Sequence, residues 1–275
     1  MSGTALRINQ LLNPTHGTSI VVAFDHGYNG EVPGGENAPD IIARMAKAQI
    51  DGILIGPGLL RQLAPLLAHP GAPRIIATLD GGTWGPLPGA EGFLTHHRRA
   101  ISPATALRYG AVAAKMILPL GMGDSKKLAD ATSLLGSTAE ECDALGLPFV
   151  IEPAFWGEYL EGGVTDQMIR HAARQSIELG ATILKLPAPS HPDVLAEIVA
   201  NAGVPVLVLG GAQQAGGDIG ETIVAWMNAG AAGVAIGRNV WGRPDMDTAI
   251  AGLRAAVYDR DAAQAKELFR QADQS

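Results

Sequence analysis

Two lysines stand inside runs of apolar residues, where a charged side chain is unexpected. Lys185 lies in the run ATILKLPAP, and Lys115 lies in VAAKMILPL. Removing an ammonium group from water is costly, so burial favours the neutral amine. A neutral lysine amine attacks a ketone or an aldehyde and forms an imine. These residues are therefore candidates for Schiff-base chemistry, and Lys185 is the first candidate for the nucleophile.

Other interpretations of the two lysines are open from the residues alone. Lys185 could extend its amine to solvent or pair with a carboxylate. Lys115 could favour a neutral amine on Lys185 by like-charge repulsion, or it could hold a phosphate or hydroxyl of a substrate. It could equally form a buried ion pair with Asp25 or Glu152.

Carboxylates stand at the ends of two apolar runs. Asp25 and His26 follow SIVVAF, and Glu152 ends FVIE. A carboxylate such as Asp25 can bind substrate hydroxyls or carry protons during C–C cleavage. The alternative for Asp25 is a turn or a helix cap. His26 could contact the substrate, orient Asp25 or be a structural histidine beside Gly27.

Glycine-bearing turns follow the last two apolar runs. Gly210, Gly211 and Ala212 form the first turn, and Gly237 and Arg238 begin the second. Backbone N–H groups at such turns bind phosphate, and an arginine adds a charge-assisted hydrogen bond. A single glycine turn is ordinary. The pair of turns after these two runs predicts a phosphate-binding site.

The histidines do not predict a metal site. Zn²⁺ sites often use histidines at H-x-H or H-x-x-x-H spacing. None of the seven histidines has such a partner; they are His16, His26, His69, His96, His97, His171 and His191. Ligands can also come from distant strands, but the sequence gives no cluster. We therefore expect no metal and no cofactor.

The elements that must position these residues are eight short apolar runs. None alternates apolar with polar residues, which is the pattern of parallel strands buried on both faces. We predict strands at Ser19–Phe24, Gly52–Ile55, Arg74–Leu79, Ala113–Leu118, Phe149–Glu152, Thr182–Leu186, Pro205–Leu209 and Gly233–Ile236.

Helical patterns separate several of these strands. They are Ser125–Ala144, Thr165–Leu179, Pro192–Asn201, Asp218–Ala229 and the terminal Asp261–Gln274. Eight strand–helix units close into a (β/α)8 TIM barrel of the α/β class, which takes about 250 residues and carries its site at the carboxyl ends of the strands. An open doubly wound sheet is the rival fold. Its dinucleotide-binding form is disfavoured because DHGYNG, and not G-x-G-x-x-G, follows the first strand.

The chain of 275 residues suits one such barrel. We predict a single (β/α)8 domain over residues 1–275, with an N-terminal helix and a C-terminal helix as extensions. The segment Asp80–Ser102, rich in glycine and histidine, is a long loop after the third strand and a candidate lid or interface element.

The composition of the chain indicates which classes of partner to expect. The net charge of −7 gives no basic face for nucleic acid. No apolar stretch is long enough to predict a membrane span, and the start MSGTALRINQLL does not resemble a signal peptide. Cys142 is the single cysteine, which suits a reducing compartment. We therefore expect a cytoplasmic protein without nucleic-acid or membrane partners.

Four motifs in chain order carry a family resemblance: VVAFDHG, ILKLP, VLVLGGA and GAAGVAIGRNVWG. From about residue 8 to its C-terminus the chain resembles the archaeal-type class I fructose-bisphosphate aldolases. That family includes the aminodideoxyheptulosonate synthases and the autoinducer-2 thiolase. The stretch GRNVWGRPDMDTAIAGLRAAVYDRDAAQAKELF is especially similar to the thiolase branch.

The resemblance implies that Lys185 forms the Schiff base and that Asp25 takes part in acid/base work at the carbonyl. It also implies a substrate-phosphate site made by Gly210, Gly211, Gly237 and Arg238, and a homo-oligomer.

The chain departs from the family after the fifth strand, where it reads IEPAFWGEYL. The family's tyrosine position holds Ala154 or Phe155, so proton transfer falls to Glu152, Tyr159 or Tyr28. GGA replaces a more usual GGK or GGS, which is expected to weaken phosphate binding. A lysine in VAAKMIL is more like the tagatose-bisphosphate and sulfofructose-phosphate aldolases.

The predicted function is a class I aldolase that reversibly cleaves a phosphorylated ketose through a lysine imine. The alternatives are acyl or ketol transfer by the same lysine, as in the thiolase or a transaldolase, and a non-catalytic barrel that binds a sugar phosphate.

Overall fold

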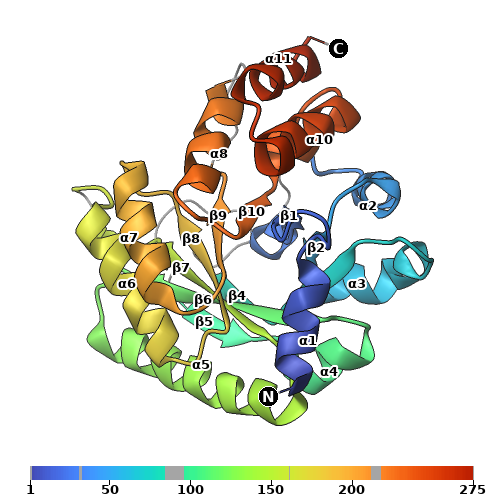
Figure 1. The fold of residues 1–275 in the computed structure, drawn as a ribbon. Helices are drawn as coiled ribbons and strands as arrows, with labels where there is room; N and C mark the ends of the chain where they lie inside the picture. The colour runs from blue at the N-terminus through green and yellow to red at the C-terminus, as the bar shows by residue number, and fades with distance from the viewer. Residues whose placement is uncertain (1, 31–32, 84–95, 161, 212–217, 275) are drawn as a thin grey trace.

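The computed structural model describes residues 2–30, 33–83, 96–160, 162–211 and 218–274. Its central element is a closed barrel of parallel strands in the order β1-β10-β9-β8-β7-β6-β3-β2. Helices surround the barrel on the outside (Figure 1). The predicted (β/α)8 TIM barrel is confirmed, and the open doubly wound sheet is excluded by closure of β1 onto both β2 and β10.

The barrel strands lie where the apolar runs predicted them. They are β1 Ser19–Phe24, β2 Gly52–Ile55, β3 Arg74–Thr78, β6 Ala113–Leu120, β7 Phe149–Phe155, β8 Ile183–Pro187, β9 Val206–Leu209 and β10 Gly233–Ile236. Strand β7 runs three residues beyond its predicted end at Glu152. It passes through Pro153 because β7 and β6 remain paired as far as Leu120 and Phe155.

The five helices predicted between and after the strands are present, each with its ends within two residues of the prediction. The helices at Ala38–Lys47, Pro57–Leu63, Pro103–Arg108, Arg238–Trp241 and Met246–Arg254 were not predicted. Thr165 caps the helix that begins at Asp166 by accepting a hydrogen bond from the backbone N–H of Met168. The helices are α1 Ser2–Leu11, α2 Ala38–Lys47, α3 Pro57–Leu63, α4 Pro103–Arg108, α5 Ser125–Leu145, α6 Asp166–Glu178, α7 Pro192–Ala202, α8 Asp218–Asn228, α9 Arg238–Trp241, α10 Met246–Arg254 and α11 Ala262–Ala272. None of the described helices is both long and apolar enough to span a bilayer.

The interior of the barrel is filled by alternate residues of its strands. Successive side chains of a strand point to opposite faces, so residues two apart share a face. One buried cluster takes a single small or branched residue from most strands, and Leu11 of α1 packs into it from the amino-terminal end; its members are Leu11, Val21, Ala23, Leu54, Ile76, Ala113, Val150, Ile183, Leu207 and Ala235. The intervening residues face the surrounding helices.

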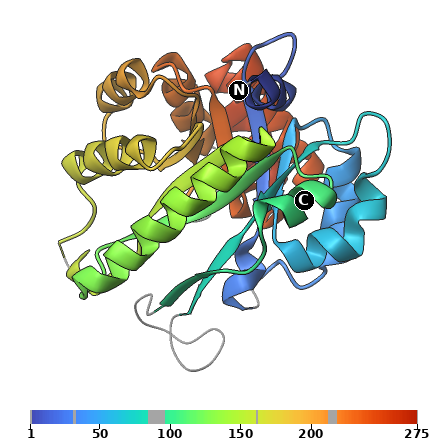
Figure 2. The same cartoon turned by 90° about the horizontal axis from the view of Figure 1, so that it is seen from below.

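The segment predicted as a loop over Asp80–Ser102 begins and ends as strand. Asp80–Thr83 (β4) pairs antiparallel with His96–Arg99 (β5), and residues 84–95 lie outside the described part of the chain. The hairpin extends from the barrel beside α5 (Figure 2). The loop prediction is wrong at these ends, because short runs rich in Gly and His carry little strand signal.

Gly233 marks a close approach between β10 and β1 that tests the barrel packing. Its φ is 150°, and a Cβ there would lie 2.1 Å from the carbonyl oxygen of Ser19. We expect Gly233→Ala to lower the free energy of unfolding by about 3 kcal/mol, because backbone cannot yield as a side chain does. Gly203→Ala is the control: its φ is 67° but nothing lies within 4 Å, so about 1 kcal/mol is expected. Urea unfolding measures both; equal losses would contradict this account.

Candidate active site

Strand alternation places the predicted chemical residues in one layer above the apolar barrel filling. Lys115 follows Ala113 by two residues, Glu152 follows Val150, and Lys185 follows Ile183, so each repeats the inward direction of a filling residue. Asp25 and Thr78 continue β1 and β3 in the same way. Asp25 follows β1 and Thr78 ends β3. Lys115 lies within β6 but is paired with Thr78, so it lies at the level where β3 ends. Barrel enzymes carry their sites at the carboxyl ends of the strands.

Four of these residues form a connected group of charges, which we call the charge quartet: Asp25, Lys115, Glu152 and Lys185. Glu152 accepts from both lysines, with its Oε1 2.8 Å from Nζ of Lys185 and its Oε2 2.8 Å from Nζ of Lys115. Lys115 also donates to Oδ2 of Asp25 at 3.2 Å. The four side chains are 5–11% exposed. Two positive and two negative groups thus neutralise one another away from water.

The contacts within the quartet favour the charged forms of Asp25, Glu152 and Lys115. Burial alone raises the pKa of both carboxyls, but the charges of Lys115 and Lys185 outweigh it and lower the pKa of Asp25 and Glu152 below their ordinary values. Burial alone lowers the pKa of Lys115, but Glu152 and Asp25 raise it well above its ordinary value. Of the interpretations left open for Lys115, the structure therefore favours the buried ion pair.

Thr78 is a member of the site that sequence reasoning missed. Its hydroxyl donates to Oδ2 of Asp25 at 2.8 Å and fixes the carboxylate that Lys115 contacts. A threonine in a strand is unremarkable on its own. Its signal is positional, since it follows the inward-facing Ile76 by two residues.

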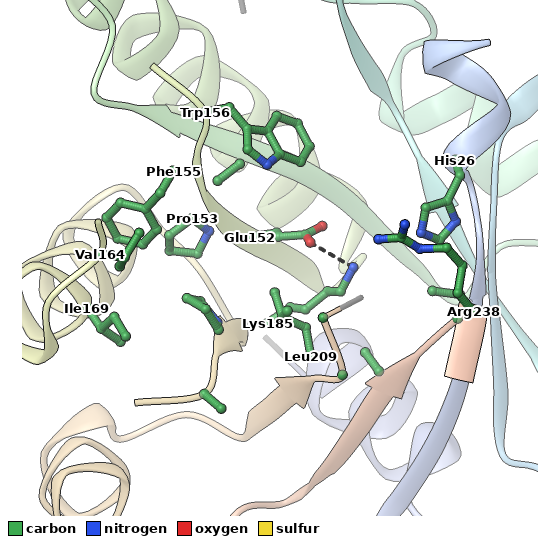
Figure 3. A pocket seen from close by; sticks show the side chains of 18 of the residues that line it. His26, Glu152, Pro153, Phe155, Trp156, Val164, Ile169, Lys185, Leu209 and Arg238 are labelled. Atoms are coloured by element: carbon green, nitrogen blue, oxygen red, sulfur yellow. Dashed lines mark ion pairs between the residues drawn. The ribbon is translucent and has the colours of Figure 1, made fainter. Parts of the chain in front are cut away.

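A cavity of about 380 Å³ opens over one side of the quartet. Glu152 and Lys185 lie at its floor, and Arg238 and His26 lie together beside them (Figure 3). Gly210, Gly211 and Gly237 also line it, whereas the cavity lining does not include Asp25 or Lys115. The predicted Ala212 lies outside the described residues. Among the quartet, Glu152 and Lys185 are thus the members that a substrate could touch.

The end of the cavity near Arg238 contains polar atoms that have no partner among the residues the structure describes. Nε of Arg238 and Nδ1 of His26 are both buried without a hydrogen bond, and a buried unsatisfied polar atom costs free energy. Burial lowers the pKa of His26, against the opposing effect of Asp25. An anion bound here would satisfy such donors. Helix α9, which begins at Arg238, is a single turn.

Packing also requires glycine at two of the predicted phosphate-site positions. A Cβ on Gly237 would lie 2.6 Å from the carbonyl oxygen of Ala23, and one on Gly210 would lie 2.9 Å from Ile236. The buried Asn239 links the two turns by donating to the carbonyl oxygen of Gly210 at 3.1 Å. The turns that were separate in the sequence are therefore adjacent in the fold.

Of the two tyrosines proposed for proton transfer, the one whose side chain the structure describes does not join the site. Tyr159 is 74% exposed and does not line the cavity. The side chain of Tyr28 lies outside the described part of the structure. Of the three candidates, Glu152 is the one placed against Lys185.

A buried pair of Asp80 and His97 lies next to the quartet. Oδ2 of Asp80 is 2.6 Å from Nε2 of His97 and accepts from the backbone N–H of Ile117 at 2.7 Å. The pair ties the β4–β5 hairpin to β6 close to Lys115, and the charge of Asp80 contributes to raising the pKa of that lysine.

The fold and the buried lysine are those of a class I, Schiff-base-forming aldolase. The family model described as DeoC/LacD family aldolase matches residues 19–243, from β1 to just beyond α9. The chain belongs to the DeoC/LacD aldolase family.

Curated relatives and a solved structure are similar over most of the chain. The 2-amino-3,7-dideoxy-D-threo-hept-6-ulosonate synthase 1 of Archaeoglobus fulgidus is 30% identical over 88% of this chain and 85% of its own. The class 1 fructose-bisphosphate aldolase of Thermoproteus tenax is 29% identical over 88% and 90%. An archaeal fructose-1,6-bisphosphate aldolase, solved with its catalytic lysine bound to the carbinolamine intermediate, has a TM-score of 0.78 and 25% identity, covering 93% of this chain and 99% of that one.

Because Glu152 belongs to the buried quartet, we expect its substitution to destabilise the protein much more than substitution of Glu197, although both glutamates contact cations. Glu152→Gln removes one negative charge and leaves two buried lysines facing Asp25 alone. We expect a loss of about 3 kcal/mol in the free energy of unfolding at pH 7. In the control, Glu197→Gln breaks a half-exposed ion pair with Arg170 and should cost less than about 1 kcal/mol. Chemical denaturation measures both, and a Glu152→Gln loss no larger than the control would contradict the electrostatic account.

Proposed function

We propose that this enzyme reversibly cleaves a phosphorylated ketose through an imine on Lys185. The observation that carries the proposal is the position of Lys185, whose amine lies at the cavity floor 2.8 Å from Glu152. The similar enzyme of Thermoproteus tenax is named as an aldolase of fructose bisphosphate, which supports a phosphate on the substrate. The unpartnered donors of Arg238 and His26 supply a place for it.

The reaction begins when the Lys185 amine adds to the substrate carbonyl and water leaves. The iminium nitrogen then carries a positive charge where the ammonium did. As the C–C bond breaks, its electron pair moves to this nitrogen, the neutral enamine forms, and the hydroxyl proton of the departing aldehyde goes to a base. Protonation of the enamine carbon and hydrolysis of the imine release the second product and restore the lysine.

Glu152 is the base that the geometry favours, because it lines the cavity and contacts Lys185. The positive charges of Lys115 and Lys185 lower its pKa in the free enzyme, and an iminium on Lys185 keeps a positive charge at the same place. When the nitrogen becomes a neutral enamine, one positive charge disappears, and Glu152 becomes a better proton acceptor. The proton transfer removes one negative charge, so the quartet remains neutral overall throughout.

Asp25 and Lys115 act in this proposal as positioning residues. Lys115 bridges Asp25 to Glu152 and fixes the Oε2 atom, which leaves Oε1 directed at Lys185. The substrate phosphate is held by Arg238 and by the turns at Gly210, Gly211 and Gly237.

Reductive trapping tests the proposal. With dihydroxyacetone phosphate and borohydride, we expect one covalent adduct, located at Lys185 by peptide mass spectrometry. The adduct should be absent from Lys185→Ala and unchanged in Lys47→Ala, which removes an exposed lysine of α2. An adduct that survives Lys185→Ala would move the nucleophile to Lys115. No adduct in the wild-type protein would favour a non-catalytic sugar-phosphate-binding barrel.

Arg238 tests the placement of the phosphate. We expect Arg238→Gln to raise KM for a phosphorylated ketose roughly 10- to 100-fold with kcat changed far less, because a charge-assisted contact is worth about 1.5–3 kcal/mol. Arg170→Gln, on the outer face of α6 and paired with Glu197, should leave both constants unchanged. A fall in kcat alone would show that Arg238 does not bind the phosphate in the ground state.

A further inference from the structure

We infer that the aldehyde half of the substrate carries no phosphate and presents an apolar group, so that the substrate is a ketose monophosphate and not a bisphosphate. The inference rests on the proposed function, which places the carbonyl at Lys185 and one phosphate beside Arg238. It concerns the opposite end of the same cavity, which has a different chemical character.

The cavity has a polar end and an apolar end, with Lys185 between them (Figure 3). Arg238 and His26 lie on one side of the lysine, and Phe155, Val164 and Ile169 lie on the other. A ketose bound as an imine at Lys185 with its phosphate at Arg238 must extend its remaining carbons toward the second side. That side therefore receives the fragment that leaves as the aldehyde.

The apolar end offers no cation to a second phosphate. The lysines and arginines among the described lining residues are Lys185 and Arg238 alone, both already assigned. The charged residue at the apolar end is Asp166, whose carboxylate repels a phosphate and accepts from the backbone N–H of Ser190 at 2.7 Å. A doubly charged group placed against Phe155, Trp156 and Ile169 would lose hydration without gaining a counter-charge.

The neighbouring helix α6 does not supply the missing charge. Its first turn is capped by Thr165, whose hydroxyl accepts from the N–H of Met168. Its nearest arginine, Arg170, donates two hydrogen bonds to one carboxylate oxygen of Glu197, at 2.9 and 2.7 Å. That ion pair borders a different depression on the outside of the barrel.

The parts of the chain outside the described residues cannot supply it either. Residues 31–32, 84–95, 161 and 212–217 read EV, WGPLPGAEGFLT, E and AQQAGG, and contain no lysine or arginine. These stretches therefore add no lysine or arginine to the count made for the described residues.

One basic surface lies nearby and defines the competing hypothesis. A separate cavity of about 400 Å³ is lined by Arg98, Lys126 and Lys127 together with Asp124 and Asp130. Met122 lines that cavity and Trp156 lines the active-site cavity, and both pack on the buried pair Ile117 and Ala154. Because this packing stands between them, a phosphate on the aldehyde half does not reach these lysines without displacing Trp156.

The synthetic direction tests the inference directly. The enamine made from dihydroxyacetone phosphate attacks the aldehyde carbon, the new C–C bond forms, the aldehyde oxygen takes a proton from Glu152, and water releases the ketose. We therefore compare glyceraldehyde 3-phosphate with two uncharged acceptors, glyceraldehyde and 3-methylbutanal, at one concentration of donor. We expect kcat/KM for 3-methylbutanal to exceed that for glyceraldehyde 3-phosphate at least 10-fold, with glyceraldehyde between them.

A matched pair of variants tests the effect of a positive charge placed at the apolar end of the cavity. Val164 lines the apolar end and is 42% exposed, so a longer polar side chain there can be solvated without disturbing the core. Val164→Arg should raise kcat/KM for glyceraldehyde 3-phosphate at least 10-fold relative to Val164→Gln, and should not raise it for the uncharged acceptors.

The outcomes separate the two proposals. Borohydride trapping of dihydroxyacetone phosphate at Lys185 is measured on the same preparation, so its absence counts against the proposed function. If trapping succeeds and glyceraldehyde 3-phosphate is the preferred acceptor, the imine stands and the inference about the aldehyde half is overturned. If that preference is then lost in the double variant Lys126→Met/Lys127→Met, the second phosphate occupies the basic cavity.

Discussion

The rest of the site depends on the neutrality of four buried charges. Glu152 bridges Lys115 and Lys185, and Lys115 continues the chain of contacts to Asp25. A buried ion whose partner is removed costs several kcal/mol, so none of the four can be altered alone without consequence for the others. The same coupling links charge on the Lys185 nitrogen to the proton affinity of Glu152. The ion pairs that stabilise the quartet are thus the same interactions that, in our proposal, control proton transfer to Glu152.

The barrel supplies the geometry for this arrangement through a simple periodicity. Strands β1, β3, β6, β7 and β8 each contribute an apolar residue to the filled interior and, two positions later along the chain, a polar side chain to the site. Leu11 of helix α1 closes the interior at the amino-terminal end of the barrel. Strand closure then brings together residues separated by up to 160 positions, such as Asp25 and Lys185. The cavity above them has its polar end at Arg238 and its apolar end at Phe155 and Trp156.

Much of this could be predicted from the sequence because it depends on local pattern. Continuous apolar runs placed all eight barrel strands. The ends of these runs identified Asp25 and Glu152, and Lys115 and Lys185 were identified as charges inside them. An ion pair of Lys115 with Asp25 or Glu152 was one of the alternatives that the sequence left open, and the sequence could not decide between them because the pairing depends on the register between strands. Thr78 was missed because its identity carries no signal without its inward direction. The β4–β5 hairpin was missed because glycine and histidine are weak strand formers.

The central claim is that Lys185, and not Lys115, bonds the substrate at the floor of the cavity. The most direct measurement is a crystal structure of the enzyme soaked with dihydroxyacetone phosphate and frozen during turnover. We predict continuous electron density from Nζ of Lys185 to the ketone carbon, with the phosphate at Arg238 and Glu152 still between the two lysines. Density joined to Lys115, or a ligand bound without a covalent link to either lysine, would contradict this account.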